Sequence, residues 1–321
     1  MRQVLLSVAI IFFLLLASLQ SRAQGCCTVG ASSLGGLESG VQREHTWSIA
    51  LGYQSNSVTQ AYQGTQKIAD PLRRTADVRY LTVQSEYGLL DRLSVLASIN
   101  YSDKTRELTI TRGSGSSRTE QTASFRGTGI GDLLVVVKYS LLQPTLPKPF
   151  GIAIGMGASL PTGSFTKDQN GSQLSIDLQP VTGAAALLSW LFVSRGFPEV
   201  GLQFFLSSTY RYAGTNFDGY RLGDEVLATF LAEKSINENF SGFIALRSRF
   251  AQKDHAGRRF LIGTGGSYHD FLPGIGYAEG ASSVRIFAQL PLYRNVRGIQ
   301  LAPAYMPGVE FRYQFEQSNE R

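Results

Sequence analysis

The sequence predicts an all-β protein: a closed antiparallel transmembrane β-barrel of about 12 strands that follows a cleaved signal peptide. Three observations predict it: an apolar N-terminal segment, apolar residues that alternate with small or polar ones, and links between strands that alternate long and short. Only 17% of the 321 residues are charged, whereas 34 are glycine and 11% are aromatic. Soluble proteins carry roughly a quarter charged residues, so this composition favours an exported β protein.

The first 23 residues have the pattern of a secretory signal peptide. Arg2 precedes an apolar run from Val4 to Leu19, and Ser21-Arg22-Ala23 offers a cleavage site of small residues. The run is shorter than the roughly 20 residues of a membrane-spanning helix, so we expect cleavage after Ala23. The predicted divisions are 1–23, signal peptide; 24–45, N-terminal periplasmic segment or plug; 46–315, transmembrane barrel; and 316–321, polar C-terminal tail.

Alternation with a period of two continues along most of the chain after residue 45. In residues 46–55, 93–103, 150–160 and 305–315 every second residue is mostly large and apolar, and the residues between them are mostly small or polar. This is the pattern of a strand with one apolar face, and several segments reach the roughly 9–11 residues that cross a bilayer. Because backbone polar groups in hydrocarbon need internal partners, such strands must close into a barrel.

The lengths of the links give a second signal. We expect strands at 46–55, 77–88, 93–103, 129–142, 150–160, 182–194, 199–212, 223–234, 241–251, 261–277, 284–293 and 305–315. The links between them alternate long and short, with the long ones at 56–76, 104–128, 161–181, 213–222, 252–260 and 294–304. Bacterial outer-membrane barrels have short periplasmic turns and long outer loops. The predicted location is therefore the outer membrane of a Gram-negative cell, with aromatic residues near strand ends, such as Tyr53 and Trp190, at the membrane interfaces.

Four short motifs follow one another along the predicted barrel. They are Tyr87–Ser94, Thr128–Leu142, Ser159–Gly163 and Gln289–Leu301. In this order they resemble the outer-membrane transporter family named for meta-pathway phenol degradation. The resemblance implies a β-barrel that moves hydrophobic or small organic solutes across the outer membrane, and it implies no catalytic residues. Met306–Tyr313 also resembles the last-strand signal that the barrel-insertion machinery recognises in outer-membrane proteins, although the chain continues through Gln314 and Phe315 into a polar tail.

Strand parity predicts which polar side chains face the interior. The candidates for lining the lumen are Gln84, Glu86, Asn100, Asp132, Lys138, Gln203, Arg211, Arg247, Arg249, Gln289, Glu310 and Arg312. An Arg or Lys on the lipid face would cost about 2–4 kcal/mol at mid-bilayer, so inward placement is nearly forced. Ion pairs that merely fill the barrel are the alternative role for any one of them. A barrel of twelve strands lies between filled and widely open ones, which suits small solutes.

The sequence offers little for catalysis, cofactors, metals or nucleic acid. His269 is the only histidine on an expected strand, in Ser267-Tyr268-His269-Asp270. A Ser and an Asp beside a His in sequence do not make a triad, because neighbours on a strand point to opposite faces. The adjacent Cys26 and Cys27 could bind a soft metal, but without a third ligand nearby we expect a passive thiol pair. A formal charge of +6, evenly spread, argues against nucleic acid.

We therefore predict a porin-like transport channel rather than an enzyme, without a cofactor. It would allow passive passage of small, hydrophobic or aromatic solutes. Its expected partners are outer-membrane lipid, small organic solutes and the barrel-insertion machinery. The alternative is a non-conducting surface barrel whose long loops bind a ligand or partner.

Overall fold

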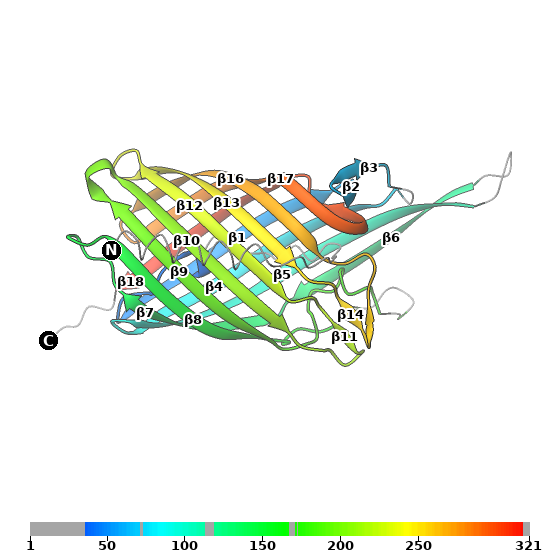
Figure 1. The fold of residues 1–321 in the computed structure, drawn as a ribbon, viewed down its shortest axis with the longest axis horizontal. Helices are drawn as coiled ribbons and strands as arrows, with labels where there is room; N and C mark the ends of the chain where they lie inside the picture. Colours follow the sequence, from blue (N-terminus) through cyan, green and yellow to red (C-terminus); the bar gives the residue numbers. More distant parts are fainter. Residues whose placement is uncertain (1–35, 71–72, 113–118, 167–170, 172, 317–321) are drawn as a thin grey trace, which may run out of the picture.

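The chain forms a closed antiparallel barrel of twelve strands (Figure 1). This computed structural model describes residues 36–70, 73–112, 119–166, 171 and 173–316. Around the wall the order is β16–β13–β12–β10–β9–β8–β7–β5–β4–β1–β18–β17, and β17 pairs with β16 to complete the ring. The first strand pairs with the last, from Thr46 opposite Glu316 to Gln54 opposite Gly308. The predicted fold class and strand number are confirmed.

The wall strands agree closely with the expected ones. They are β1 (Thr46–Val58), β4 (Thr75–Leu90), β5 (Leu93–Arg112), β7 (Leu133–Leu142), β8 (Phe150–Leu160), β9 (Ala186–Phe197), β10 (Leu202–Ala213), β12 (Glu225–Ser235), β13 (Phe240–Ala251), β16 (Gly266–Glu279), β17 (Ser282–Ala302) and β18 (Met306–Glu316). The remaining elements are β2 (Gln60–Gly64), β3 (Gln66–Ile68), β6 (Thr119–Ile130), β11 (Tyr220–Arg221), β14 (His255–Ala256), β15 (Arg259–Phe260), and the 3-10 turns η1 (Gly36–Glu38) and η3 (Pro198–Val200). Within the described ranges, no helix has the length and apolar character needed to cross a membrane.

Alternation along the strands gives the wall two different faces. Along β1 and β4 the side chains alternate between interior and exterior. Leu51 and Val83 point outwards and are 46% and 43% exposed, whereas Ser48 and Thr82 are buried inside. The outer surface therefore presents the large apolar side chains that lipid tails can cover, while small and polar groups lie within.

Short turns lie at one end of the barrel and long loops at the other (Figure 1). At the turn end the connections are 91–92, 143–149, 198–201, 236–239 and 280–281. Gly280 has a φ of +56°, which glycine adopts without strain, and so permits one of the two turns of two residues. β1 begins and β18 ends at the same end, which is the periplasmic one in outer-membrane barrels.

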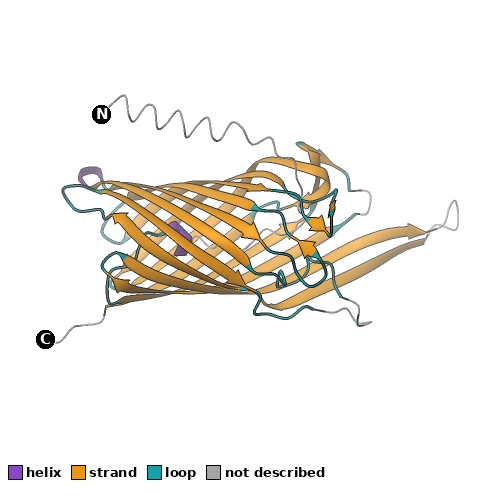
Figure 2. Cartoon of the chain, turned by 60° about the horizontal axis from the view of Figure 1, so that its bottom comes forward, coloured by secondary structure: helices purple, strands orange, loops and turns teal. Residues whose placement is uncertain are grey.

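Two expected long loops are strand instead. Residues 101–112 of β5 pair with β6, and the resulting hairpin projects beyond the outer rim (Figures 1 and 2). The outer part of β17, Val296–Ala302, pairs with β2. Polar residues on both faces remove the apolar period in the hairpin, so the sequence pattern does not reveal these strands.

Candidate functional site

The interior of the barrel contains the N-terminal segment, defined here as residues 36–45 (Figure 2). The carbonyl oxygen of Leu37 accepts hydrogen bonds from Trp190 Nε1 at 2.7 Å and Ser207 Oγ at 2.5 Å. Trp190 is only 3% exposed, so its expected place at the membrane interface is wrong. Its parity places the ring inside, where the indole N–H needs a partner and finds one in this segment.

A lysine on the same part of the wall, Lys138 of β7, also holds this segment. Lys138 is fully buried, and its Nζ lies 3.0 Å from Glu86 Oε2 and donates to the carbonyls of Ser39 and Gly40 at 3.2 Å each. Ser94 Oγ donates to the second oxygen of Glu86 at 2.7 Å. An ammonium has three donors, and here each has an acceptor. The cluster makes a buried charge tolerable and ties the segment to the wall.

A chain of polar groups on the opposite wall also reaches the segment. Arg247 Nη2 contacts Glu38 Oε1 at 2.6 Å, and Arg247 Nη1 donates to Gln289 Oε1 at 3.1 Å. Gln289 donates to Asp270 at 2.8 Å, and Asp270 forms an ion pair with Arg294. These contacts cross from the N-terminal segment through three wall strands.

Sequence parity does not find Arg294, although its side chain is only 3% exposed. Pairing between β16 and β17 steps from His269 opposite Tyr293 to Asp270 opposite Pro291, so β17 carries one extra residue. Such a bulge reverses the parity of everything beyond it. The proline between apolar residues is the one signal in the sequence that marks this position.

The described residues of the loop at 161–185, which are 161–166, 171 and 173–185, fold into the outer end of the barrel. Its Leu174, Leu178 and Val181 are buried. Lys104 Nζ donates to the carbonyl of Gln179 at 2.7 Å, and the Gln179 side chain is bonded to the loop's own backbone. The loop is therefore held inward over the lumen rather than extended from the rim.

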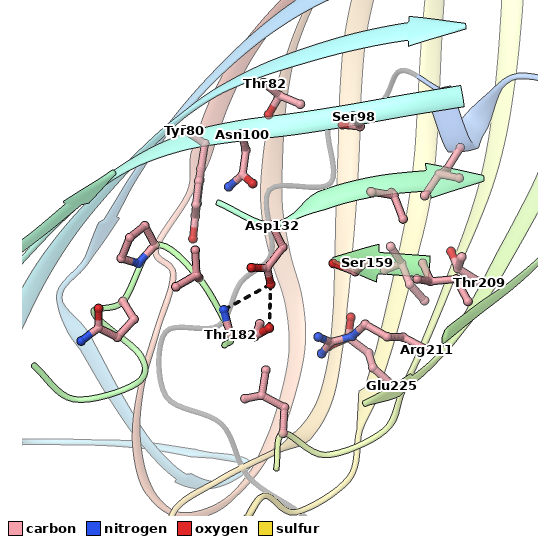
Figure 3. Close-up of a pocket in the computed structure, with 18 of the residues that line it drawn as sticks. Tyr80, Thr82, Ser98, Asn100, Asp132, Ser159, Thr182, Thr209, Arg211 and Glu225 are labelled. Carbon is pink, nitrogen blue, oxygen red and sulfur yellow. Dashed lines mark hydrogen bonds and ion pairs between the residues drawn. The ribbon is translucent and has the colours of Figure 1, made fainter. Parts of the chain in front are cut away.

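Between this loop and the N-terminal segment lies a cavity of about 290 Å³, here called the outer cavity (Figure 3). Leu37 bounds it from the periplasmic side, and Ile176, Pro180 and Val181 bound it from the outer side. Its wall is amphipathic: the apolar part is formed by Leu134, Leu188, Leu222 and Leu227, and the polar part by Thr82, Ser98, Asn100, Asp132, Ser159, Thr209, Arg211, Glu225 and Arg249.

The charged groups of the outer cavity are held in place from several strands. Asp132 accepts hydrogen bonds from Thr182 N at 3.2 Å and Thr182 Oγ1 at 2.6 Å (Figure 3). Arg249 Nε donates to Glu225 Oε2 at 2.6 Å, whereas Arg211 Nη2 lies 3.8 Å from the same oxygen. The cavity thus offers hydrogen-bonding groups beside an apolar surface.

Two further cavities lie on the periplasmic side of the N-terminal segment. One, of about 380 Å³, is bounded by Glu38, Ser39 and Gly40 and contains Arg285 and Arg312. The other, of about 620 Å³, is bounded by Gly40 to His45 without Gln42. We call these the inner cavities. The segment therefore separates them from the outer cavity.

The twelve polar residues chosen by parity lie on inward-facing positions of the wall. Gln84, Glu86, Lys138, Arg247, Gln289 and Glu310 are buried, Asn100, Asp132, Arg211 and Arg249 line the outer cavity, Arg312 lines an inner cavity, and Gln203 is exposed near the turn end. Several interact with one another or with the N-terminal segment. Contact with a passing solute is a separate matter and is taken up as a proposal below.

Ionisable groups in the outer loops form a small cluster of their own. Asp254 accepts hydrogen bonds from the hydroxyl of Tyr220 at 2.5 Å and from Gly223 N at 2.7 Å. Burial nevertheless raises the pKa of the Asp254 carboxyl above its usual range. Burial and the neighbouring Asp254 charge also raise the pKa of the Tyr220 hydroxyl. This cluster stabilises the loops carrying β11 and β14.

Metal-binding side chains do not gather in the part of the lumen that the structure describes. No three His, Cys, Asp or Glu side chains come together to hold a metal within the described part of the chain. Cys26 and Cys27 lie outside the described residues. His269 Nδ1 lies 2.8 Å from Ser248 Oγ beside Tyr293, on the outward face of the wall.

Comparison with protein families agrees with this geometry. The model of a family described as "Putative MetA-pathway of phenol degradation" matches residues 93–270, from the start of β5 into β16. The chain belongs to this family. No curated protein matches the sequence.

One solved structure shows the same fold, and two others are more distantly similar. An outer membrane channel from Pseudomonas putida F1 has a TM-score of 0.61 at 13% identity, covering 88% of this chain and 98% of that one. The CymD monoaromatic hydrocarbon channel has a TM-score of 0.42 at 11% identity, covering 86% and 90%, and a Pseudomonas aeruginosa FadL homologue has 0.41 at 8%, covering 84% and 89%. Only the first is close enough to inform the fold. The protein therefore has the fold of an outer-membrane β-barrel.

Proposed function

We propose that the barrel is a channel for the passive passage of small hydrophobic or aromatic solutes. The outer cavity carries this proposal, because it combines about 290 Å³ of space with an apolar surface formed in part by four leucines. An apolar cavity of about 150 Å³ is large enough to bind benzene. The outer cavity can therefore hold one solute with a single ring, together with water.

The path continues past the N-terminal segment, which acts as a plug. Leu37 bounds the outer cavity, and residues 38–41 and 43–45 bound the inner cavities on the periplasmic side of the segment. A solute leaving the outer cavity must therefore pass residues 36–45 or wait for them to move. The twelve inward polar residues line this route, and ion pairs among them reduce the charge that a neutral solute meets.

Permeability of reconstituted vesicles tests the proposal. Vesicles that contain the purified protein are expected to take up polar test solutes no larger than benzyl alcohol faster than protein-free vesicles do. Deleting residues 36–44 is expected to raise the size limit, because the outer and inner cavities then join. Equal permeability of vesicles with and without the protein would contradict the proposal.

A variant that lacks the tip of the β5–β6 hairpin, residues 108–123, is the matched control. The hairpin projects beyond the rim (Figure 1), and its described residues 108–112 and 119–123 do not line the outer cavity. Its removal is expected to leave permeability unchanged. The same variant examines the second candidate function, a surface barrel that binds a partner through its loops, since that function predicts lost binding without altered permeability.

A further inference from the structure

We propose that the solutes of this channel include small organic anions with an apolar body and one carboxylate, and that Arg211 selects them. This inference rests on the proposed channel function and names the chemical class of its solute. It starts from the one guanidinium of the outer cavity that is left largely uncommitted.

Arg211 lies on β10 with its side chain in the outer cavity and 24% exposed there. Within the described part of the chain its guanidinium donates no hydrogen bond, and its closest carboxylate oxygen is Glu225 Oε2 at 3.8 Å. That distance allows an ion pair but exceeds a hydrogen bond. The five donors of the guanidinium therefore face the cavity and its water.

The neighbouring acid is already engaged. Glu225 accepts a hydrogen bond of 2.6 Å from Arg249, so one carboxylate serves two guanidinium groups. Asp132, the other acid of the cavity, accepts two hydrogen bonds from Thr182. Counting Lys104, the lining of the outer cavity carries three cations and two carboxylates. One positive charge is left over, and Arg211 is where it is accessible.

The remainder of the cavity suits the apolar body of such an anion. Tyr80 and Asn100 lie across the cavity from Arg211 (Figure 3). Leu188 and Leu227 complete an apolar surface around the same space. A planar guanidinium binds a carboxylate through two parallel hydrogen bonds, and this interaction strengthens where water is largely excluded. A ring or short chain bearing one carboxylate can satisfy both parts of the cavity at once.

Arginines continue from the outer cavity towards the periplasm. Arg247 and Arg294 lie beside the N-terminal segment and the Asp270 network, and Arg285 and Arg312 line an inner cavity. Each is paired with a carboxylate, in order Glu38, Asp270, Glu233 and Glu310. Anion-conducting pores use Arg or Lys side chains in this way. A carboxylate that leaves Arg211 finds further guanidinium groups along its route.

Ion selectivity in planar bilayers tests the inference. In a gradient of potassium benzoate, the reversal potential of the wild-type channel is expected to show a benzoate permeability about tenfold above that of potassium, as a single favourable charge-assisted contact would give. Arg211→Gln is expected to reduce this ratio to near unity. Arg211→Lys is expected to restore part of it, because the charge returns without the planar fork.

A second variant is expected to change the permeability ratio in the opposite direction, which a misfolded barrel would not do. Glu225→Gln removes the acid that competes with a bound carboxylate, so the benzoate preference is expected to rise. Arg259→Gln, an exposed position in the outer-loop strand β15, is the control and is expected to leave the ratio unchanged. Heat-modifiable migration of each variant on a gel shows whether the barrel has formed.

The outcomes separate this inference from the proposed function. A cation-selective wild type, or an unchanged ratio in both Arg211→Gln and Glu225→Gln, overturns the role of Arg211. Benzamide is the neutral analogue of the same size. If it enters vesicles with the protein faster than protein-free vesicles, but benzoate is not favoured over potassium, only the anion inference fails. If neither compound crosses, the channel function itself fails.

Discussion

Lys138 shows how this protein places a charge inside a membrane-spanning wall. Its ammonium is fully buried and is shared between Glu86 and the carbonyls of Ser39 and Gly40. The Trp190 ring adds a cation–π contact at 4.9 Å. The sequence indicates an inward Lys138 by parity alone, but not its partners. Parity also places Glu86 inside, but the two carbonyl partners come from residues 36–45, where no strand period exists to orient the chain.

Replacing Lys138 by Met is expected to release the N-terminal segment and destabilise the barrel. The variant removes two hydrogen bonds to the segment and leaves Glu86 as an unpaired buried charge, for which a cost of about 3–5 kcal/mol is typical. Limited proteolysis in detergent measures release of the segment, and urea unfolding measures the barrel. Lys148→Met, at an exposed turn residue, is the control.

The double variant Lys138→Met with Glu86→Met distinguishes the two effects. Removing both charges avoids the unpaired carboxylate, so barrel stability is expected to recover while the segment remains sensitive to protease. A segment as resistant as in the wild type would show that Lys138 does not hold it.

At the scale of elements, the alternation of apolar and polar residues predicts the membrane-spanning strands well, but it does not predict their extensions beyond the outer rim. β1, β4 and β18 have one lipid face and one interior face, and the period of two follows directly from that difference. The β5–β6 hairpin beyond the rim has water on both sides, so nothing imposes a period on it. Arg294 is missed because it lies beyond the expected strand 284–293, and the bulge near Pro291 also reverses the parity of β17 at this position. The sequence pattern does not show that loop 161–185 covers the lumen, because the loop is held there by contacts with residues distant in the sequence, such as Lys104.

Gly127 is expected to control how closely that loop folds inward. A Cβ at this position of β6 would collide with the carbonyl oxygen of Leu178. Gly127→Ala should therefore displace loop 161–185, with a cost of about 1–3 kcal/mol, as is usual for overpacking. Solute flux into vesicles measures this displacement and is expected to increase, while heat-modifiable migration on a gel is expected to show that the barrel wall still forms.

Gly242→Ala is the matched control for Gly127→Ala. A Cβ on Gly242, in β13, meets only Ile236 at 3.8 Å, which is an ordinary contact. Both variants place alanine in a barrel strand, so a change in flux common to both would show that the loop contact is not its cause.

At the scale of the whole molecule, closure depends on the pairing of β1 with β18. Leu51 lies opposite Phe311 in this register. Antiparallel neighbours have Cα separations of about 4.5–5.5 Å, which a disulfide can bridge. Leu51→Cys with Phe311→Cys is therefore expected to form a disulfide on oxidation and to increase the thermal stability of the barrel, seen as a raised temperature of gel-shift conversion.

An offset pair tests whether that register is correct. Leu51→Cys with Val309→Cys is displaced by two residues, since Val309 lies opposite Tyr53. It is expected to cross-link much more slowly. Faster cross-linking of the offset pair would mean that the seam is displaced from the pairing described here.

The closed ring also sets an order of events during biogenesis. Export delivers a polypeptide from its first residue, so residues 36–45 reach the periplasm before any strand of the wall. Their binding place exists only when β13, which carries Arg247, and β7, which carries Lys138, stand in one cylinder. Residues 36–45 precede every strand of the wall in the sequence, yet they can make these contacts only after the wall has formed around them.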